Sequence, residues 1–242
     1  MAEDIAKESP ILGYSPIDWR TKTNSNGDNC MWPILNQGQC GSCWTFSTQS
    51  SMSANTCIML LGTLQNFSTQ ELVDCVKTCY GCNGGNVSYA CNYLKTHEEI
   101  LWDNYPYTAL DGTCQYSSMP LYPIECSSYK YAPSGSVSTM QDMLQSGILS
   151  VAIQANQFAF QNYSGGIFND ANCGTKLDHA TNVVGWGTDS TTGVDYWIMR
   201  NSWGTTWGDQ GWMQIEISTT VNNGAGYCGI QSQAEQLTPK NV

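Results

Sequence analysis

Charged residues are scarce in this sequence, and basic residues especially so. They make up 12% of its 242 residues, about half of the usual share in soluble domains. Nine Lys and Arg stand against twenty Asp and Glu, so the formal net charge is −11. Binding to nucleic acid needs a basic surface, and this balance argues against it. An acidic surface is otherwise compatible with an acidic compartment and with ordinary solvation.

Long apolar runs are also missing. The longest, at 57–61, ends at Gly62, whereas a membrane-spanning helix needs about 18 or more apolar residues, so no membrane partner is expected. The first residues are acidic and lack the basic and apolar character of a secretory signal. We therefore expect residues 1–13 to be a leader or a propeptide remnant and residues 14–242 to form the folded unit.

Cysteine is abundant instead, with twelve in the chain. In the cytosol so many cysteines would indicate metal binding or catalysis, and in a secretory compartment they would form disulfides. Three Asn-x-Ser acceptors for N-glycosylation, at Asn66, Asn86 and Asn162, favour the secretory route. The combination predicts a lysosomal, vacuolar or secreted protein, and the sequence leaves glycan occupancy open.

The pattern of apolar residues changes near residue 130. Before it, an uninterrupted run without Gly or Pro, a capping box at Ser68 and a segment after a glycine-rich loop predict three helices. After it, short apolar runs bounded by Gly, Asn and Ser predict strands, two of them joined by a hairpin loop. The expected helices are 43–61, 68–76 and 87–97, the flexible loop is 81–85, the strands are 149–153, 180–184, 196–199 and 212–217, and the hairpin loop is 188–193.

A helical half followed by a β-rich half indicates an α+β fold of two lobes. We expect the helical lobe over about 28–130 and the β-rich lobe over about 131–235, with terminal segments that cross between them. A cleft between two such lobes is a natural place for a binding site.

The Cys-Gly-Ser-Cys segment at 40–43 allows three chemistries. As half of a zinc site it would pair with Cys79 and Cys82, but 35 residues separate the two pairs, against roughly 15 to 20 in zinc ribbons. As a redox dithiol it would follow the first strand of a parallel βαβ unit, and no such alternation follows. The third interpretation is a nucleophilic thiol at the start of a helix.

A nucleophilic thiol reacts as the thiolate, and it needs a base, a group that orients the base, and donors for the oxyanion. The chain has two histidines. His97 has polar neighbours on both sides, which indicates a solvated helix end, whereas His179 stands at the entry to an apolar strand. Together with Cys43 and Asn201, His179 is a candidate for a catalytic triad.

These motifs resemble those of papain-like cysteine peptidases of the cathepsin type. That family carries Cys-Gly-[Ser/Ala]-Cys-[Trp/Tyr] near the mature N-terminus, with His and Asn roughly 130 to 150 residues further on. The likeness covers about 14–240 and is carried by the segments 37–44, 81–85, 178–180 and 201–208. It implies a papain-like fold with a helical lobe, a β-barrel-like lobe and the active site between them.

The resemblance assigns a role to each matching residue. Cys43 would be the nucleophile and His179 the base, paired as thiolate and imidazolium. Asn201 would hold the imidazole, and Trp203 would shield it. Gln37 and the backbone N–H of Cys43 would form the oxyanion hole. This chemistry requires neither a metal ion nor an organic cofactor.

Substrate contacts follow from the same resemblance. Gly84 and Gly85 would offer bare backbone to an extended peptide. The pocket for the side chain two residues before the cut would be apolar with Gln233 at its floor, so we expect Leu, Val or Phe there and no strong preference for Arg. The other expected contacts are Val87, Ala152, Leu177, Asp178, Ala180 and Trp203.

The resemblance also implies four disulfides. Cys40 would then be structural and Cys43 reactive. Three cysteines, Cys79, Cys91 and Cys126, stay unassigned, and at least one of them must be free or bonded elsewhere. The implied bridges are Cys40–Cys82, Cys75–Cys114, Cys173–Cys228 and Cys30–Cys57.

The expected function is that of a cysteine endopeptidase, because the adjacent His pair of dipeptide-trimming relatives is missing. By family likeness its partners would be peptide or protein substrates, its own propeptide and cystatin-like inhibitors, and it would act as a monomer. Two alternatives are a catalytically silent binding protein and a disulfide oxidoreductase.

Overall fold

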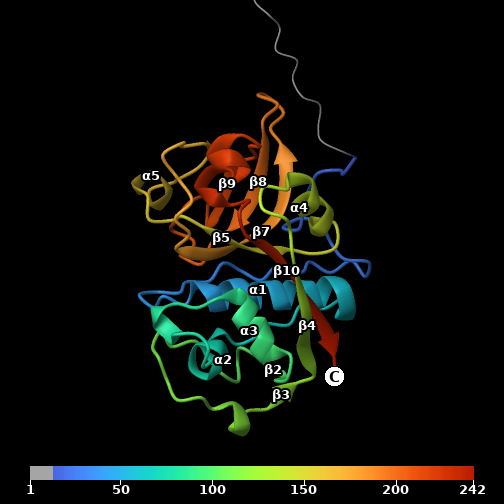
Figure 1. Ribbon diagram of the computed structural model, residues 1–242. Coiled ribbons are helices and arrows are strands. Elements are labelled where there is room, and N and C mark those ends of the chain that lie inside the picture. Colours follow the sequence, from blue (N-terminus) through green and yellow to red (C-terminus); the bar gives the residue numbers. More distant parts are fainter. Residues whose placement is uncertain (1–12) are drawn as a thin grey trace, which may run out of the picture.

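The computed structural model describes residues 13–242. The leader or propeptide remnant expected at 1–13 therefore lies, apart from Gly13, outside the described residues. Figure 1 shows a β-rich half above a helical half, with helix α1 (Cys43–Thr56) lying along the boundary between them. The two-lobed α+β fold predicted from the sequence is confirmed.

Helix α1 begins at Cys43, as predicted, and is buried on nearly all sides. Twelve of its fourteen residues are buried, many of them polar. Ser47 Oγ donates to the carbonyl of Thr181 (2.8 Å), and Asn55 Nδ2 donates to that of Leu237 (2.9 Å). Buried polar groups need such partners, so these bonds fix α1 against two strands of the main sheet.

The other helices of this half follow their capping residues. The run predicted as one helix over 43–61 continues from α1 as a π-helical turn, Cys57–Leu61, and ends at Gly62, whose φ is 73°. Helix α2 (Thr69–Cys75) is capped by Ser68, whose Oγ accepts from the N–H of Glu71 (3.0 Å). Both boundaries agree with the sequence patterns.

Helix α3 (Val87–Leu94) is three residues shorter than predicted. His97 folds back onto it, with Nδ1 2.9 Å from the carbonyl of Tyr93 and the two rings stacked. Strand β2 (Glu99–Ile100) follows directly and pairs with β3 (Leu121–Tyr122) in a small ribbon. The chain therefore leaves the helix after Leu94, where the stacking of His97 and the pairing of β2 with β3 replace further helical turns.

The strands of the main sheet are β1 Ile17–Asp18, β4 Ile124–Tyr131, β5 Leu149–Ile153, β6 Ile167–Phe168, β7 His179–Thr188, β8 Asp195–Arg200, β9 Trp212–Glu216 and β10 Ala234–Asn241. Their order is β4-β10-β5-β7-β8-β9-β6, with β1 added to β7. The four predicted strands are present as β5, β7, β8 and β9, and the predicted hairpin joins β7 to β8. Helices α4 (Val137–Leu144) and α5 (Phe158–Gln161) lie beside the sheet.

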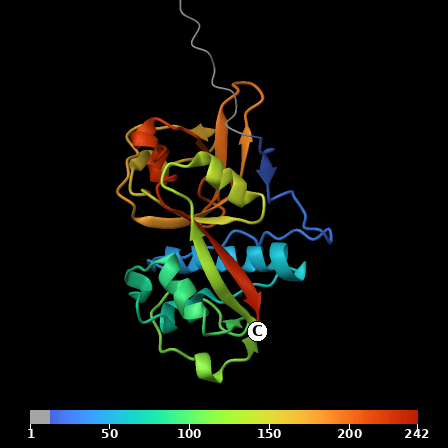
Figure 2. The ribbon, with the colours of Figure 1, turned by 45° about the vertical axis from the view of Figure 1, so that its right-hand side comes forward.

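Strands β4 and β10 connect the two halves. They pair antiparallel from Glu235 opposite Tyr131 to Asn241 opposite Ile124. Both views show this pair running from the sheet down into the helical half (Figures 1 and 2). Ile124 and Leu237 are buried in the core of the helical half, so this strand pair contributes packing to that half.

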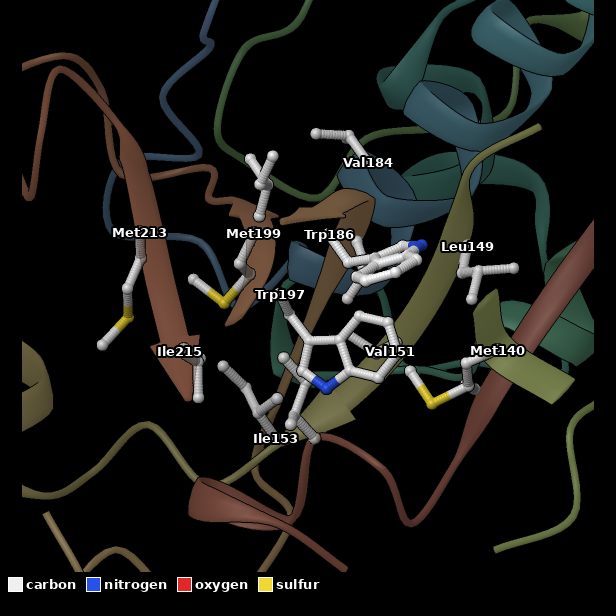
Figure 3. Close-up of a cluster of buried hydrophobic side chains, with 14 of the residues drawn as sticks. Met140, Leu149, Val151, Ile153, Val184, Trp186, Trp197, Met199, Met213 and Ile215 are labelled. Atoms are coloured by element: carbon white, nitrogen blue, oxygen red, sulfur yellow. The ribbon is translucent and has the colours of Figure 1, made fainter. Parts of the chain in front are cut away.

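Each half has its own buried apolar cluster. The larger lies within the β-rich half around Trp197, with Met140, Val151 and Ile215 among the side chains that surround it (Figure 3). The smaller lies between the helices and β4. Its largest fully buried side chains are Trp44, Phe67, Met52, Leu72 and Leu94.

The structure contains five disulfides. Four are those implied by the family resemblance: Cys30–Cys57, Cys40–Cys82, Cys75–Cys114 and Cys173–Cys228. The fifth, Cys91–Cys126, links α3 to β4 and could not be assigned from sequence. Cys43 and Cys79 are free. No helix in 13–242 has the length and apolar character needed to cross a membrane.

Candidate active site

A cleft of about 670 Å³ is lined by residues of both halves. The helical half contributes Gln37, Cys43 and Gly84, and the β-rich half contributes His179 and Trp203. In the sequence, Gln37 and Trp203 are more than 160 positions apart. The fold therefore gathers the predicted catalytic residues at one site, whereas His97 stacks on Tyr93 of α3.

Cys43 is the first residue of α1, where unpaired N–H groups and the helix dipole favour an anion. Burial by itself raises the pKa of this thiol, but a hydrogen bond from His179, the charge of His179 and the backbones of Ala180 and Trp44 outweigh it, and the pKa of Cys43 is lowered. The other free cysteine shows the opposite, since burial raises the pKa of Cys79. The two thiols should thus differ in reactivity.

His179 is buried at the start of β7, where it pairs with Ile153 of β5. Its Nε2 lies 2.8 Å from Oδ1 of Asn201. Because an amide oxygen only accepts, Nε2 carries a proton and Nδ1 is left to face the thiol. Burial lowers the pKa of His179, but hydrogen bonding and charge from Cys43, then Asn201 and Asp178, raise it overall. These opposite shifts favour a proton on His179 and a thiolate at Cys43.

The ring of Trp203 covers the imidazole. Its centroid is 4.9 Å from that of His179, with an angle of 37° between the rings. Trp203 is held in turn by edge contacts with Phe160 (5.7 Å) and Trp207 (5.3 Å). This aromatic cluster keeps water away from the hydrogen bond between His179 and Asn201, which strengthens that bond.

Gln37 is buried beside the thiol with its carboxamide held at both ends. Its Oε1 accepts from Ser202 Oγ (2.7 Å), and its Nε2 donates to the carbonyl of Cys40 (2.9 Å). A primary amide has two N–H groups, so one donor stays available to the cleft. Ser202 was not among the predicted site residues, although it lies inside the Asn-Ser-Trp motif that located Asn201.

The segment 81–85 was expected to be a flexible loop, and the structure corrects this. It contains a 3₁₀ turn, Gly81–Asn83, joined to Cys40 through its central cysteine and to Gly41 by a 2.8 Å hydrogen bond from the Gly41 N–H to the carbonyl of Cys82. A Cβ at Gly85 would lie 2.5 Å from the Trp44 ring. Close packing therefore requires glycine at position 85. A disulfide, a backbone hydrogen bond and this packing hold the wall of the cleft in place.

The disulfide pattern also removes the zinc interpretation of the Cys-x-x-Cys pairs. Cys40 is bonded to Cys82, so each pair has only one free thiol, Cys43 in the first and Cys79 in the second. A ribbon of four thiolate ligands cannot form from these residues.

Comparison with known proteins agrees with this geometry. A family model described as "Papain family cysteine protease" matches residues 15–238. The chain belongs to the papain family. It is 36% identical over 237 residues to the thiol protease SEN102 of Hemerocallis, which covers 95% of this chain and 62% of that protein. It is 38% identical to chymopapain of Carica papaya over 88% of this chain and 57% of the relative. The chain thus spans less than two thirds of these relatives.

Solved structures of papain-family proteases share the fold. The Carica candamarcensis protease CMS1MS2, determined in complex with E-64, has a TM-score of 0.83 and 35% identity, covering 94% of this chain and 99% of that one. The proform of the ragweed pollen protease Amb a 11 has a TM-score of 0.84 and 26% identity, covering 97% of this chain and 69% of that one.

The residues expected to contact substrate line this papain-family cleft together with the Cys43 thiol. Asp178 is held at the rim, with its Oδ1 accepting from the Ala155 N–H (2.7 Å). Val87 is buried, and Leu177 is 37% exposed. The predicted contacts that line the cleft are Gly84, Gly85, Val87, Ala152, Leu177, Asp178, Ala180, Trp203 and Gln233.

One residue of this cleft was missed by sequence reasoning. Glu235 also lines it, is 3% exposed, and carries a buried Oε2 without a hydrogen-bond partner. No strand was predicted at this position, and Gln233 lies just before β10 (Ala234–Asn241), so no local pattern indicated Glu235. The cleft is therefore lined by the carboxyl group of Glu235 as well as by the amide of Gln233.

Proposed function

We propose that this protein is a cysteine endopeptidase that acts through a Cys43 thiolate. The observation that carries the proposal is the meeting of Cys43 and His179 in one cleft. The pKa of Cys43 is lowered and that of His179 is raised, so each group favours its own charged form. Asn201 orients the imidazole through the 2.8 Å hydrogen bond to Nε2. The first two residues supply nucleophile and acid, and the third keeps the acid aimed.

The reaction follows from this geometry. The Cys43 sulfur adds to the scissile carbonyl carbon, and the oxyanion accepts from the Cys43 backbone N–H and the remaining Nε2–H of Gln37. His179 then gives its Nδ1 proton to the leaving amine as the C–N bond breaks, which leaves a thioester. Water adds to the thioester with His179 as base, the C–S bond breaks, and the new carboxylic product leaves with the thiolate restored.

The proposed substrate is an extended peptide that pairs with Gly84 and Gly85. Its side chain two residues before the cut would lie against Val87, Ala152 and Ala180, which favours Leu, Val or Phe. No adjacent His pair is present in the sequence to bind a terminal carboxylate. These features support endopeptidase action.

Partners and location follow as proposals of the same kind. Two of the related structures are described as proforms, which supports binding of a propeptide along the cleft, and cystatin-like inhibitors would use the same surface. Five disulfides support a lysosomal, vacuolar or secreted location. We propose that the protein acts there as a monomer.

A fluorogenic peptide with Leu two residues before the cut tests the proposal. Hydrolysis should stop when one equivalent of an alkylating reagent has reacted, with the label on Cys43. Cys43→Ala should be inactive, and the matched control Cys79→Ala should remain active, since it removes the other free thiol. A silent homologue would show no hydrolysis in any form of the protein. An oxidoreductase would reduce a disulfide substrate instead and would need Cys40 as a free thiol.

A further inference from the structure

The hydroxyl group of Tyr107 bridges the two chain segments that carry the proposed oxyanion donors. It donates to the backbone carbonyl of Gln37 at 2.7 Å. It also lies 2.6 Å from Oγ of Ser42, the residue before the nucleophile Cys43. A hydroxyl carries a single proton, so at this second contact Ser42 donates and Tyr107 accepts. One oxygen atom therefore joins the backbone of Gln37 to the start of helix α1.

Ser42 does not use its side chain as a residue at its position ordinarily does. It is the N-cap residue of α1, yet its side chain makes no capping hydrogen bond to the helix. A serine there usually accepts from the N–H of the second or third helical residue. The second of these, Trp44, instead directs its N–H at the sulfur of Cys43. The buried hydroxyl of Ser42 is thus committed to Tyr107.

Tyr107 is itself anchored in the helical half. Its ring meets the ring of Phe46 in α1 edge-on, with the two centroids 4.8 Å apart. The next residue, Thr108, donates from its backbone N–H to Oε1 of Gln70 in α2 at 2.9 Å. These contacts fix the position of the hydroxyl relative to both helices.

Gln37 is bonded to the opposite half as well. Its backbone N–H donates to the carbonyl of Ser202 at 2.8 Å, and its Oε1 accepts from Oγ of the same serine. Its Nε2 donates to the carbonyl of Cys40, in the loop that leads to α1. The bond from Tyr107 adds a support from the helical half that does not depend on this loop.

We propose that the Tyr107 hydroxyl is a positioning group for the oxyanion hole, held in place by Ser42. It sets the spacing between the backbone N–H of Cys43 and the remaining Nε2–H of Gln37. The inference rests on the proposed peptidase function and adds two residues to its machinery. Because the hydroxyl bonds to Gln37 and Ser42, Tyr107 acts through these residues.

The hydroxyl should matter for acyl transfer and leave the ionisation of the thiol unchanged. An oxyanion forms only when the Cys43 sulfur adds to a carbonyl, so misplaced donors slow that step. Burial raises the pKa of Cys43, and the hydrogen bond and charge of His179 outweigh it. All of these stay in place when Tyr107 loses its hydroxyl. Alkylation of the thiol, which displaces a halide and forms no oxyanion, is therefore an internal reference.

The test compares Tyr107→Phe with the parent protein in two reactions of one thiol, with Cys79→Ala in both so that Cys43 is the free thiol. Hydrolysis of the fluorogenic peptide with Leu two residues before the cut (the Leu peptide) gives kcat and KM per site alkylated by iodoacetamide. The rate of that alkylation is measured over about pH 5 to 9, around the ordinary thiol pKa. We expect kcat to fall about three- to tenfold, as for the loss of one neutral hydrogen bond, with KM and the alkylation profile unchanged.

Tyr105→Phe is the matched control. It removes a tyrosine hydroxyl two residues earlier in the same segment, where that hydroxyl donates to Oδ2 of Asp74 and accepts from the N–H of Gln115. Neither partner belongs to the segments that carry the oxyanion donors. Its kcat per alkylated site should therefore stay close to that of the parent protein, even where the variant is less stable.

Ser42→Ala tests whether the two hydroxyls act in series. It should lower kcat less than Tyr107→Phe does, because Gln37 keeps its bond to the tyrosine. Once the tyrosine hydroxyl is gone, removing Ser42 Oγ should cause no further loss. The double variant therefore gives a non-additive cycle, and additive losses would contradict the series.

The outcomes separate the two proposals. A Tyr107→Phe protein with unchanged kcat per site overturns the positioning role and leaves the peptidase function standing. Equal losses in kcat and in alkylation rate overturn that role as well, since they indicate general damage to the site. Wild-type protein that hydrolyses no peptide overturns the peptidase function and the inference with it.

Discussion

The two walls of the cleft are held in place by different means. The wall that carries Cys43 belongs to the half with the smaller apolar cluster, 13 buried residues, and four of the five disulfides. The wall that carries His179 is backed by a cluster of 29 buried residues and one disulfide, Cys173–Cys228. Small cores need covalent links that large cores do not. Disulfides therefore contribute more to holding the wall that carries the nucleophile Cys43, and apolar packing contributes more to holding the wall that carries the base His179.

The largest expected effect separates the chemical roles of the two walls. His179→Ala removes the acid and base but leaves the helix terminus of Cys43 intact. Peptide hydrolysis should fall by roughly 10⁴-fold or more, as for other members of a catalytic triad. Steady-state kinetics on the Leu peptide measures this. Activity within tenfold of wild type would show that His179, on the β-rich wall, does not take part in the chemical steps.

A matched pair of stability variants tests the comparison itself. Trp197→Ala should lower the free energy of unfolding by about 3 to 5 kcal/mol, because it leaves a cavity in the larger cluster. Replacing both Cys91 and Cys126 by Ala should lower the free energy of unfolding by about 3 to 4 kcal/mol, because the unfolded helical half loses a cross-link and gains conformational entropy.

Denaturant unfolding in the presence and absence of reductant measures both variants. Reductant should destabilise the Trp197→Ala protein further and should change the double Cys variant less, since one bridge is already gone. Equal sensitivity of the two variants to reductant would contradict the division between bonded and packed walls.

Gln37→Ala gives a smaller loss on the nucleophile's wall. It removes one oxyanion donor and leaves the backbone N–H of Cys43, so kcat should fall about 10²- to 10³-fold. KM should change little, because the donor acts on charge that forms after binding. A change confined to KM would show that Gln37 binds substrate without stabilising the oxyanion.

The smallest expected effect concerns a pair of buried carboxyl groups in the helical half. Glu71 and Glu99 are both fully buried, and Gln49 Nε2 donates to Glu99 at 2.7 Å. Burial raises the pKa of Glu99 to about 8, and burial with the charge of Glu99 raises that of Glu71. A raised carboxyl pKa stabilises the fold at low pH, and this stability is lost as pH rises from about 4 toward 8.

Glu99→Gln should therefore raise the free energy of unfolding at pH 8, by about 1 to 3 kcal/mol relative to its effect at pH 5. Glu216→Gln in the β-rich half is the contrast variant, and its change should stay within about 0.5 kcal/mol at both values. Denaturant unfolding at the two pH values measures each. A Glu99 variant with the same effect at both would show that the pair does not titrate with folding.

The parts of the fold with a regular local pattern were predictable from sequence. Helix α1 lies in a run without Gly or Pro and begins where predicted, and strands β5, β7 and β8 contain the predicted apolar runs, although β7 extends to Thr188. Strands β4 and β10 were not found, because their burial changes along their length as they pass from one half to the other. In β10 Pro239 also breaks the register. Such strands are defined by distant partners, which no local pattern records.

The site divides in the same way. The motifs around Cys43, His179 and Asn201 indicated the catalytic residues, because their chemistry restricts the residue types. Ser202 and Glu235 were missed, since only the fold places Ser202 against Gln37 and Glu235 in the cleft. The bridge between Cys91 and Cys126 was left open, because the family resemblance implied a partner for neither cysteine and only the fold brings them together.

The ionisation of Cys43 tests the account most directly. The rate of alkylation of this thiol should be measured against pH in the wild type and in His179→Ala, with Cys79→Ala in both to leave one free thiol. We predict that wild-type Cys43 reacts as a thiolate well below the ordinary cysteine pKa of about 8.5, and that His179→Ala moves the midpoint upward. Identical profiles with a midpoint near the ordinary value would contradict the thiolate–imidazolium pair.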